Sequence, residues 1–293
     1  MKTLTITDVR AVPGDSAFLI DDGTTAILYD SGFAFTGERV AENIRVKLGT
    51  RPLDYIFLSH SHYDHVLGSP YVARVWPGAK VVAGAYAERI FQKPSARAVM
   101  RELNGKAARE HGVTAWEDLI DELKVDIPVE DGDSIVCGDL VCKVIALPGH
   151  TKCSVGYYLE EQRLLLGSET LGVYFGGGIY LPSFLVGYQV TLDSFRKAKT
   201  LELERMLLPH YGVVEGAELR ACLEKSEKAT VETARRIVDL FRAGKTEEEI
   251  LAFLTETDYS ESVRPTYPID AFLLNTGIMI GQVRKELLPG SEG

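Results

Sequence analysis

The sequence predicts an α/β protein in which two β-sheets pack face to face, with helices on the outside. Two observations support this prediction. Residues 3–83 and residues 125–208 each contain strand-like runs followed by a helical stretch and a further strand. Residues 85–123, and those beyond 212, instead have helical spacing with interspersed charges. At 293 residues, the chain is long for one simple domain, so we expect one core with an appended part.

The N-terminal residues have the pattern of an antiparallel meander. Strands are expected at Thr3–Val12, Ala17–Ile20 and Thr25–Tyr29, the last two joined by a turn at Asp21-Asp22-Gly23. An Asp-Gly pair between apolar runs is typical of a hairpin turn. The sequence therefore predicts three paired strands before the first helix.

A helix and alternating strands are expected next. Gly37–Leu48 has helical spacing and leads into an apolar, strand-like run at Tyr55–Leu58. A short helix at Pro70–Val75 and a strand at Ala79–Ala83 continue the alternation. From 85 to about 123 the pattern is amphipathic and lacks strand signals, which predicts a helical insertion over one face.

The second half begins with strands and ends with helices. Five strands are expected at Val125–Ile127, Ser134–Cys137, Leu140–Ala146, Ser154–Leu159 and Arg163–Leu166. A helix at Thr191–Thr200 and a closing strand at Arg205–Leu208 should follow. Beyond these, helices are predicted at Glu215–Arg242, Thr246–Thr255 and Ile269–Leu287, with a proline-containing linker at 263–268.

The charge balance bears on the class of partner. With 42 acidic and 32 basic residues, the formal net charge is −10, which argues against nucleic acid or an anionic membrane as the main partner. The N-terminus has no apolar stretch of signal-peptide length, and no run approaches the roughly 20 apolar residues that span a bilayer. We therefore expect a cytoplasmic protein that acts on a small molecule. Its four cysteines match no zinc-finger spacing.

One segment concentrates the chemistry. After the strand-like Tyr55–Leu58, four potential ligands follow within six positions: His60, His62, Asp64 and His65. Because side chains alternate along a strand, His60 and His62 leave the strand end on the same side and suit one metal ion. Asp64 and His65 come after a turn and suit a second ion nearby. Imidazole and carboxylate groups are ligands that zinc, iron and manganese accept.

Further potential ligands also follow apolar strands. His150 comes after a Pro-Gly turn at the end of one strand, His210 comes directly after another, and Glu169 ends a third apolar run. Their shared position at strand ends predicts a common site. Asp30, also at a strand end, is expected either to support the ligands from behind or simply to cap a turn.

These motifs resemble the metallo-β-lactamase superfamily. The resemblance rests on His60-Ser-His62-Tyr-Asp64-His65, Pro148-Gly149-His150-Thr151, the acid after the next strand, and Pro209-His210-Tyr211-Gly212. It covers about residues 3–215 and implies an α/β, αββα four-layer sandwich with a dinuclear metal site. On this reading, residues 1–215 form the catalytic domain, with the helical insertion at about 85–123, and residues 216–293 form a C-terminal helical subdomain.

The resemblance also implies a ligand assignment. Histidines 60, 62 and 150 would hold one divalent metal ion, Asp64, His65 and His210 the other, and Glu169 would bridge them. The chain departs from the family here, since most dinuclear members have an aspartate preceded by glycine where this sequence has Ser168-Glu169. The longer glutamate either bridges both ions, if its loop recedes, or binds only one. Zinc is the expected metal, with iron and manganese as alternatives.

The expected reaction is hydrolysis by a metal-bound hydroxide, because two adjacent cations lower the pKa of a shared water. Asp64 is the predicted catalytic residue, holding or shuttling a proton. The resemblance is to the cytoplasmic glyoxalase II-like, thioesterase-like and lactonase-like members, so small thioesters, esters or lactones are the expected substrates. Tyr174 and Phe175, in a segment with three consecutive glycines, and Tyr211 are predicted to contact substrate, although that segment also suits a flexible surface loop.

Two other functions remain compatible with the residues. In the first, Glu169 makes hydrolysis inefficient, and the chain is a metal-containing ligand-binding or regulatory protein. In the second, both sites hold iron and the protein has a redox role. Slow turnover with tight retention of one ligand would favour the first, and colour with an iron content near two per chain would favour the second.

Overall fold

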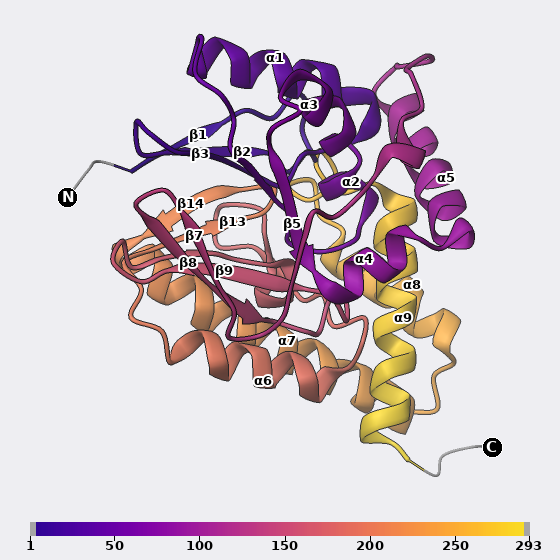
Figure 1. Ribbon diagram of the computed structural model, residues 1–293. Helices are drawn as coiled ribbons and strands as arrows, with labels where there is room; N and C mark the ends of the chain where they lie inside the picture. Colours follow the sequence, from indigo (N-terminus) through magenta and orange to yellow (C-terminus); the bar gives the residue numbers. More distant parts are fainter. Residues whose placement is uncertain (1–3, 290–293) are drawn as a thin grey trace. The chain divides into compact units, whose positions relative to one another are not determined.

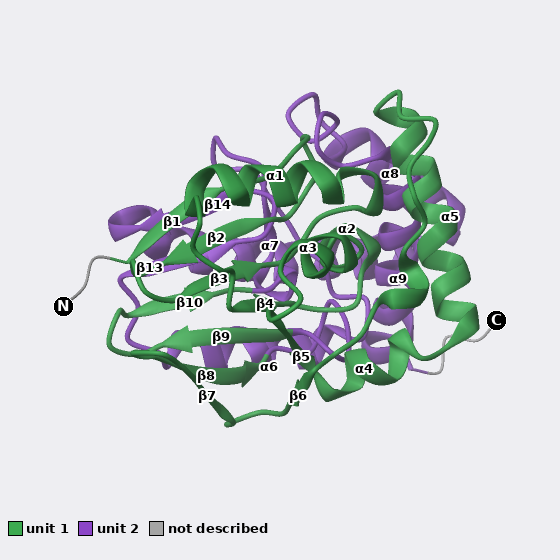
Figure 2. Cartoon of the chain, turned by 45° about the horizontal axis from the view of Figure 1, so that its top comes forward, with its two compact units in different colours: residues 1–146, 155–167 green, residues 147–154, 168–293 purple. Residues whose placement is uncertain are grey.

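The computed structural model describes residues 4–289, which form two compact units (Figure 2). Among these residues, the first unit comprises 4–146 and 155–167, and the second comprises 147–154 and 168–289. The chain thus enters the second unit briefly around His150 before returning to the first. The boundary expected near residue 215 stays a prediction, because compactness alone does not separate a catalytic part from a helical one.

A six-stranded sheet lies within the first unit (Figure 1). Its strands, in sheet order, are β1 (Thr5–Asp8), β2 (Phe18–Asp21), β3 (Ala26–Tyr29), β4 (Tyr55–Phe57), β5 (Lys80–Gly84) and β6 (Ile127–Val129). The first three are antiparallel, as the Asp-Gly turn predicts, and β3 to β6 are parallel. Because parallel strands end at one edge of a sheet, Asp30 and His60, which follow β3 and β4, are brought to the same edge.

The sixth strand differs from its expected place. The sequence predicts a strand at Val125–Ile127 that opens the second group of strands, whereas β6 covers Ile127–Val129 and pairs with β5 in the first sheet. The pairing joins Val82 to Ile127. An isolated three-residue strand carries no sequence signal for its partner, and so its sheet could not be assigned.

Four further strands of the first unit form an antiparallel meander. They are β7 (Ser134–Cys137), β8 (Leu140–Ala146), β9 (Val155–Leu159) and β10 (Leu164–Leu166). The ring of Tyr157 on β9 lies 4.5 Å from that of Phe57 and 6.3 Å from that of Tyr29, between centroids. Its hydroxyl donates to the carbonyl of Leu58 at 2.9 Å. The two groups of strands therefore share one core, as the predicted face-to-face arrangement requires.

Helices of the first unit flank the sheet. They are the 3₁₀ turn η1 (Ala34–Thr36), α1 (Gly37–Leu48), α2 (Tyr63–Val66) and α3 (Ser69–Val75). Helix α1 has the predicted bounds, and it buries Val40, Ile44 and Leu48 on one face. Gly68, before α3, is required by close packing, because a Cβ there would lie 1.8 Å from the carbonyl oxygen of Ser31.

The predicted insertion is helical over most of its length. It contains α4 (Ala85–Phe91) and α5 (Pro94–Glu110), followed by an irregular stretch and the 3₁₀ turn η2 (Ile120–Glu122). The helical pattern therefore stops at Glu110, before the expected end near 123. Gly112, with φ of +70°, follows the C-terminus of α5 in a left-handed conformation that ends a helix.

The second unit is mainly helical. Its elements are η3 (Glu169–Leu171), β11 (Val173–Tyr174), β12 (Tyr180–Leu181), α6 (Tyr188–Lys199), β13 (Arg205–Leu208), β14 (Gly212–Glu215), α7 (Gly216–Arg242), α8 (Glu247–Asp258) and α9 (Ile269–Leu287). Each predicted C-terminal helix is present. Phe184 and side chains of α7, α8 and α9 form a shared apolar cluster, including Ile237, Ile250 and Ile280. Burial of these side chains, each worth about 1.5–3 kcal/mol, stabilises the helices against one another.

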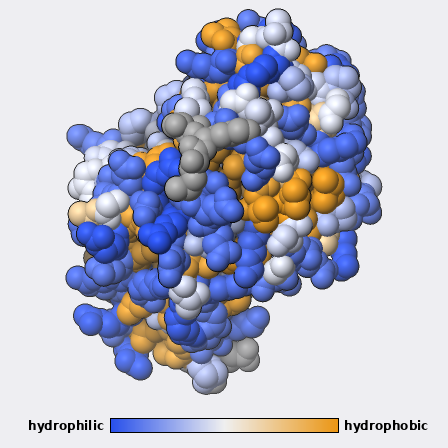
Figure 3. Space-filling view, turned by 60° about the vertical axis from the view of Figure 1, so that its left-hand side comes forward, coloured by the Kyte–Doolittle hydropathy of each residue, from blue (hydrophilic) through white to orange (hydrophobic). Residues whose placement is uncertain are grey.

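The helices of the described chain include none that could cross a membrane. Among residues 4–289, no helix combines the length and the apolar composition that crossing a bilayer requires. On the face shown in Figure 3, hydrophilic side chains surround the apolar patches.

Candidate metal centre

The loop after β4 delivers the first four predicted ligands from the first unit. His60 and His62 follow the strand directly, and Asp64 and His65 lie on the short helix α2. The rings of His60 and His62 are 4.6 Å apart between centroids, and those of His60 and His65 are 4.1 Å apart. The predicted turn between the two ligand pairs is therefore present, and it keeps all four side chains together.

Asp30 is hydrogen-bonded to residues of this loop. Its Oδ2 lies 2.7 Å from Nδ1 of His65 and accepts from the hydroxyls of Ser16 (2.9 Å) and Ser59 (3.0 Å), while Oδ1 accepts from the backbone N–H of Ser59 at 2.8 Å. Asp30 and His65 are fully buried, and Asp30 has a φ of +53°. Of the two roles left open for Asp30, the structure supports the one behind the ligands.

Ser59 orients the neighbouring histidine. Its Oγ lies 2.9 Å from Nδ1 of His60 and directs its own proton to Asp30. A hydroxyl has a single proton, so Oγ accepts a hydrogen bond from His60, and Nδ1 of that ring carries the proton. The lone pair is then on Nε2 of His60, the nitrogen available to a metal ion.

The Pro-Gly turn before His150 sets the position of that ring in the second unit. Gly149 has a φ of +151°, and a Cβ there would lie 2.4 Å from Oγ1 of Thr191 and 2.6 Å from Cγ2 of Thr170. The backbone N–H of His150 donates to Oγ1 of Thr170 at 3.0 Å, and Nδ1 lies 2.5 Å from Oγ of Ser183. Only glycine fits this turn, which places His150 against two hydroxyls.

Glu169 lies between two histidines of the second unit. Its Oε2 is 2.8 Å from Nε2 of His150, and its Oε1 is 3.3 Å from Nε2 of His210. His210 has a φ of +64°, a sparsely populated conformation for a residue other than glycine. The one-methylene extension over aspartate therefore does not prevent Glu169 from reaching both rings.

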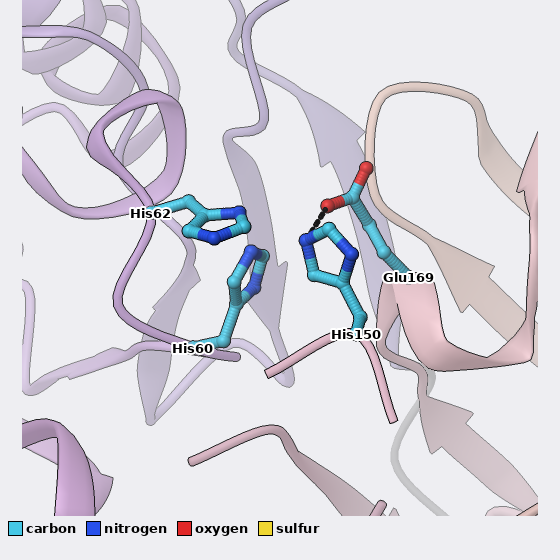
Figure 4. A group of neighbouring side chains, drawn as sticks. All are labelled: His60, His62, His150 and Glu169. Atoms are coloured by element: carbon cyan, nitrogen blue, oxygen red, sulfur yellow. Dashed lines mark ion pairs between the residues drawn. The ribbon is translucent and has the colours of Figure 1, made fainter. Parts of the chain in front are cut away.

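The predicted ligands form two groups. The first contains His60, His62, His150 and Glu169 (Figure 4), and the second contains Asp64, His65 and His210. Within each group, one ligand atom of every residue lies within 4.8 Å of the others. Imidazole nitrogens and carboxylate oxygens are a donor set that suits divalent metal ions, and three of the rings have their Nδ1 occupied by a protein partner. The side chains fit a dinuclear metal site.

Two of the predicted substrate residues, Tyr174 and Phe175, occupy a hairpin rather than a structureless loop, and the third, Tyr211, lies between β13 and β14. Strands β11 and β12 pair, and their turn contains three consecutive glycines with positive φ. The ring of Tyr174 lies 4.3 Å from that of Tyr211 between centroids, and both hydroxyls donate to Oε1 of Glu218, at 3.1 and 3.4 Å. The ring of Phe175 instead stacks on Tyr267, 6.0 Å away. Tyr174 and Tyr211 therefore share one environment and Phe175 another.

The environment of Tyr211 keeps its hydroxyl protonated. Burial, together with the charge of Glu218, raises the pKa of Tyr211 to about 12. A neutral phenol is a hydrogen-bond donor at physiological pH.

Sequence reasoning missed Ser59, Ser183 and Glu218. Ser59 immediately precedes His60, so its position beside a ligand was a usable signal. Ser183 lies 33 residues from His150, and Glu218 lies 44 residues from Tyr174 and seven from Tyr211, a spacing that matches no regular element between them. Serine and glutamate are also common surface residues. No local pattern marks them.

Comparison with known proteins identifies the family. Residues 12–210 match the metallo-beta-lactamase superfamily. A hydroxyacylglutathione hydrolase of Francisella philomiragia is 26% identical over 160 residues, which are 54% of this chain and 50% of that protein. The chain thus spans about half the length of this relative. The beta-lactamase-like protein 2 homolog of Caenorhabditis elegans is 23% identical over 251 residues, 85% of this chain and 72% of the relative.

This chain also resembles a solved structure in its fold. A metallo-beta-lactamase family protein from Thermus thermophilus aligns with a TM-score of 0.61 at 18% identity, covering 97% of this chain and 93% of that chain. The predicted fold class is thereby confirmed as an α/β metallo-β-lactamase fold with two mixed sheets and C-terminal helices. Because the family match covers more than half of its residues, the chain belongs to the metallo-β-lactamase superfamily.

Proposed function

We propose that the protein is a dinuclear metal-dependent hydrolase of small acyl thioesters, with esters and lactones as related substrates. The observation that carries this proposal is the position of Glu169, whose two carboxylate oxygens face His150 and His210, one from each ligand group. A carboxylate with its oxygens divided in this way is suited to bridging two cations. The name of the Francisella relative, hydroxyacylglutathione hydrolase, supports an acyl substrate.

The ligands would divide as the two groups do. His60, His62 and His150 would hold one ion, Asp64, His65 and His210 the other, and Glu169 would contact both. When bound there, two divalent cations lower the pKa of water towards neutrality and polarise a carbonyl oxygen. Their identity is proposed as zinc, with iron or manganese compatible with the same ligands.

The chain's own groups would handle protons and substrate orientation. Asp64 has its Oδ2 3.6 Å from Nε2 of His65, so its carboxylate is placed among the ligands, where it can accept and pass on a proton. Tyr211, adjacent in sequence to the ligand His210, has a protonated hydroxyl that can donate to a substrate oxygen in place of Glu218. Tyr174 shares that carboxylate and would hold the ring of Tyr211 in position.

A hydrolysis screen on metal-loaded protein tests the proposal. The panel contains acyl thioesters, carboxylic esters, lactones and phosphodiesters, each assayed before and after chelation and again after metal is restored. We expect thioester turnover that chelation abolishes and metal restores. Glu169→Gln should lower kcat/KM by about a hundredfold or more, since it removes the charge shared between two ligand groups. The matched control Glu232→Gln, on an exposed face of α7, should not change it.

Two results would contradict the proposal. Metal-loaded protein that hydrolyses no member of the panel but retains one ligand tightly would identify a binding protein. Turnover that persists undiminished after complete removal of metal would place the chemistry elsewhere.

A further inference from the structure

An aromatic surface of the first unit has no part in the mechanism proposed above. Its five ring-bearing side chains, which we call the aromatic platform, are Phe33, Phe35, Tyr63, His111 and Trp116. Phe33, at the centre, is buried, whereas the other four are partly or largely exposed. Aromatic side chains left at a surface in a contiguous set commonly mark a binding site.

The rings are arranged as a connected series. Phe33 stacks on Phe35, with centroids 4.8 Å apart and planes 23° from parallel, and lies 5.7 Å from Tyr63. Phe35 lies 5.6 Å from His111 and 6.5 Å from Trp116, the latter edge to face. These separations fall in the range in which aromatic rings attract one another. The platform is thus an ordered surface.

Hydrogen bonds to buried side chains hold its centre. The backbone N–H of Phe33 donates to Oδ1 of Asp15 at 3.1 Å, and that of Ala34 donates to Oδ1 of Asn104 at 2.9 Å. Asp15 and Asn104 are almost completely buried, the second on α5 of the insertion. The loop that carries Phe33 and Phe35 is therefore fixed both to the loop between β1 and β2 and to the insertion. A preformed surface loses little conformational entropy when a ligand binds.

The platform is continuous with the metal ligands. Tyr63 is the first residue of α2 and stands in the sequence between His62 and Asp64, which belong to different ligand groups. From Tyr63 the rings lead through Phe33 to Phe35 and Trp116. A substrate with its reacting group at the ligands would have these aromatic side chains beside it, with their planes inclined to one another by 23° to 62°.

Local charge indicates which class of ligand the platform suits. Nη1 of Arg109 and Cη2 of Trp116 both lie within 4 Å of the Cβ position of Gly105, at 3.6 and 3.9 Å, so a guanidinium accompanies the tryptophan. Aromatic faces alone would also attract a cation, but the positive charge of Arg109 opposes one.

We infer that the platform binds the aromatic part of an aryl-acyl substrate. This inference rests on the proposed function, which it narrows from acyl thioesters in general to those with an aromatic acyl group. Stacking on one or two rings supports a preference of about three- to tenfold over an aliphatic group of similar size.

Ligand binding can be measured without any turnover. The chain has two tryptophans, so Trp76→Phe leaves Trp116 as the only indole reporter. Metal-loaded Trp76→Phe protein is titrated with phenylacetate and with hexanoate, which carry the same charge, and Trp116 fluorescence is followed. Phenylacetate should bind about three- to tenfold more tightly and perturb the Trp116 emission. Adding Phe35→Leu should abolish the preference, whereas the control Phe253→Leu, a partly exposed ring on α8, should retain it.

A kinetic comparison separates this inference from the proposed function. Phenylacetyl and hexanoyl thioesters of one thiol are compared by kcat/KM in the wild type, Phe35→Leu and Phe253→Leu. A preference for the aryl substrate that Phe35→Leu removes supports the platform. If both thioesters are hydrolysed equally well and Phe35→Leu changes neither rate, the inference that the platform binds the aryl group is contradicted. The proposed hydrolase function is then still supported. If neither is hydrolysed but phenylacetate still binds preferentially through Phe35, the platform stands and the proposed function fails.

Discussion

Asp30 Oδ2 lies 2.7 Å from Nδ1 of His65, and both side chains are fully buried. The same carboxylate accepts from the backbone and hydroxyl of Ser59, whose Oγ contacts His60. One residue thus supports a ligand in each of the two groups. Carboxylates in this position orient imidazoles and raise their basicity towards a metal ion.

Replacing Asp30 by Asn should weaken metal binding while leaving the fold intact. Asparagine tolerates the φ of +53° and fills the same space, but it removes the charge that faces His65. We expect about 10- to 100-fold lower affinity for metal and a loss of unfolding free energy of about 1–2 kcal/mol. Metal titration and urea unfolding measure the two. Asp15→Asn is a matched control, because Asp15 is equally buried but accepts from Phe33 and Thr36; equal metal affinities in the two variants would refute the role of Asp30.

Among the metal ligands, replacing Ser183 should affect only the ring of His150. Its Oγ is 2.5 Å from Nδ1, so Ser183→Ala removes the group that fixes the ring and its tautomer. Metal affinity should fall by about tenfold or more, measured by competition with a chromogenic chelator. Ser194→Ala removes another largely buried hydroxyl, which donates to the carbonyl of Pro148 in the same turn, and should leave metal affinity nearly unchanged. A similar loss in both would mean that the turn, rather than the ring contact, matters.

Gly149→Ala should destabilise the metal-free protein. The new Cβ would collide with Thr191 and Thr170, and alanine is strained at a φ of +151°. We expect a loss of about 2–4 kcal/mol in the free energy of unfolding. Gly78→Ala provides the comparison, because nothing lies within 4 Å of its Cβ position and its φ is not positive. Stability indistinguishable from that of Gly78→Ala would show that the turn accommodates a side chain.

Tyr211 should lose its hydroxyl proton only at high pH. Burial and the charge of Glu218 raise its pKa to about 12, above the unfolded value near 10. A folded pKa raised in this way contributes stability that is fully present below pH 10 and is lost as the pH rises through 12. Glu218→Gln should lower the pKa of Tyr211. The titration of Tyr211 is the difference in alkaline absorbance between a protein and its Tyr211→Phe variant, and this difference is compared with and without Glu218→Gln. An unchanged titration would exclude the influence of Glu218.

The sequence predicts the ligands because their signal is local. Each histidine of the site follows an apolar strand, and strand ends converge, so the positions of His60, His150 and His210 implied a common place before any contact was known. The signals for the C-terminal helices were equally local: α9 has its predicted bounds, α7 begins one residue later than predicted, and α8 begins one residue and ends three residues later. Helical spacing over ten or more residues is a strong signal.

What the sequence did not predict depends on contacts between distant segments. Ser183 lies 33 residues beyond His150, and Phe35 meets His111 only through the insertion. The hairpin β11–β12 was expected as a glycine-rich loop, because two-residue strands carry almost no alternation. Such features are set by tertiary packing, which no local pattern records.

The central claim is that Glu169 joins two metal sites, and metal stoichiometry tests it most directly. Wild-type protein purified without chelator and its Glu169→Ala variant are analysed by elemental mass spectrometry, with Glu232→Ala as the control. Two metal ions per chain in the wild type and in the control, falling to about one in Glu169→Ala, are expected if the carboxylate bridges. The same metal content in all three proteins would contradict the claim that Glu169 is a ligand.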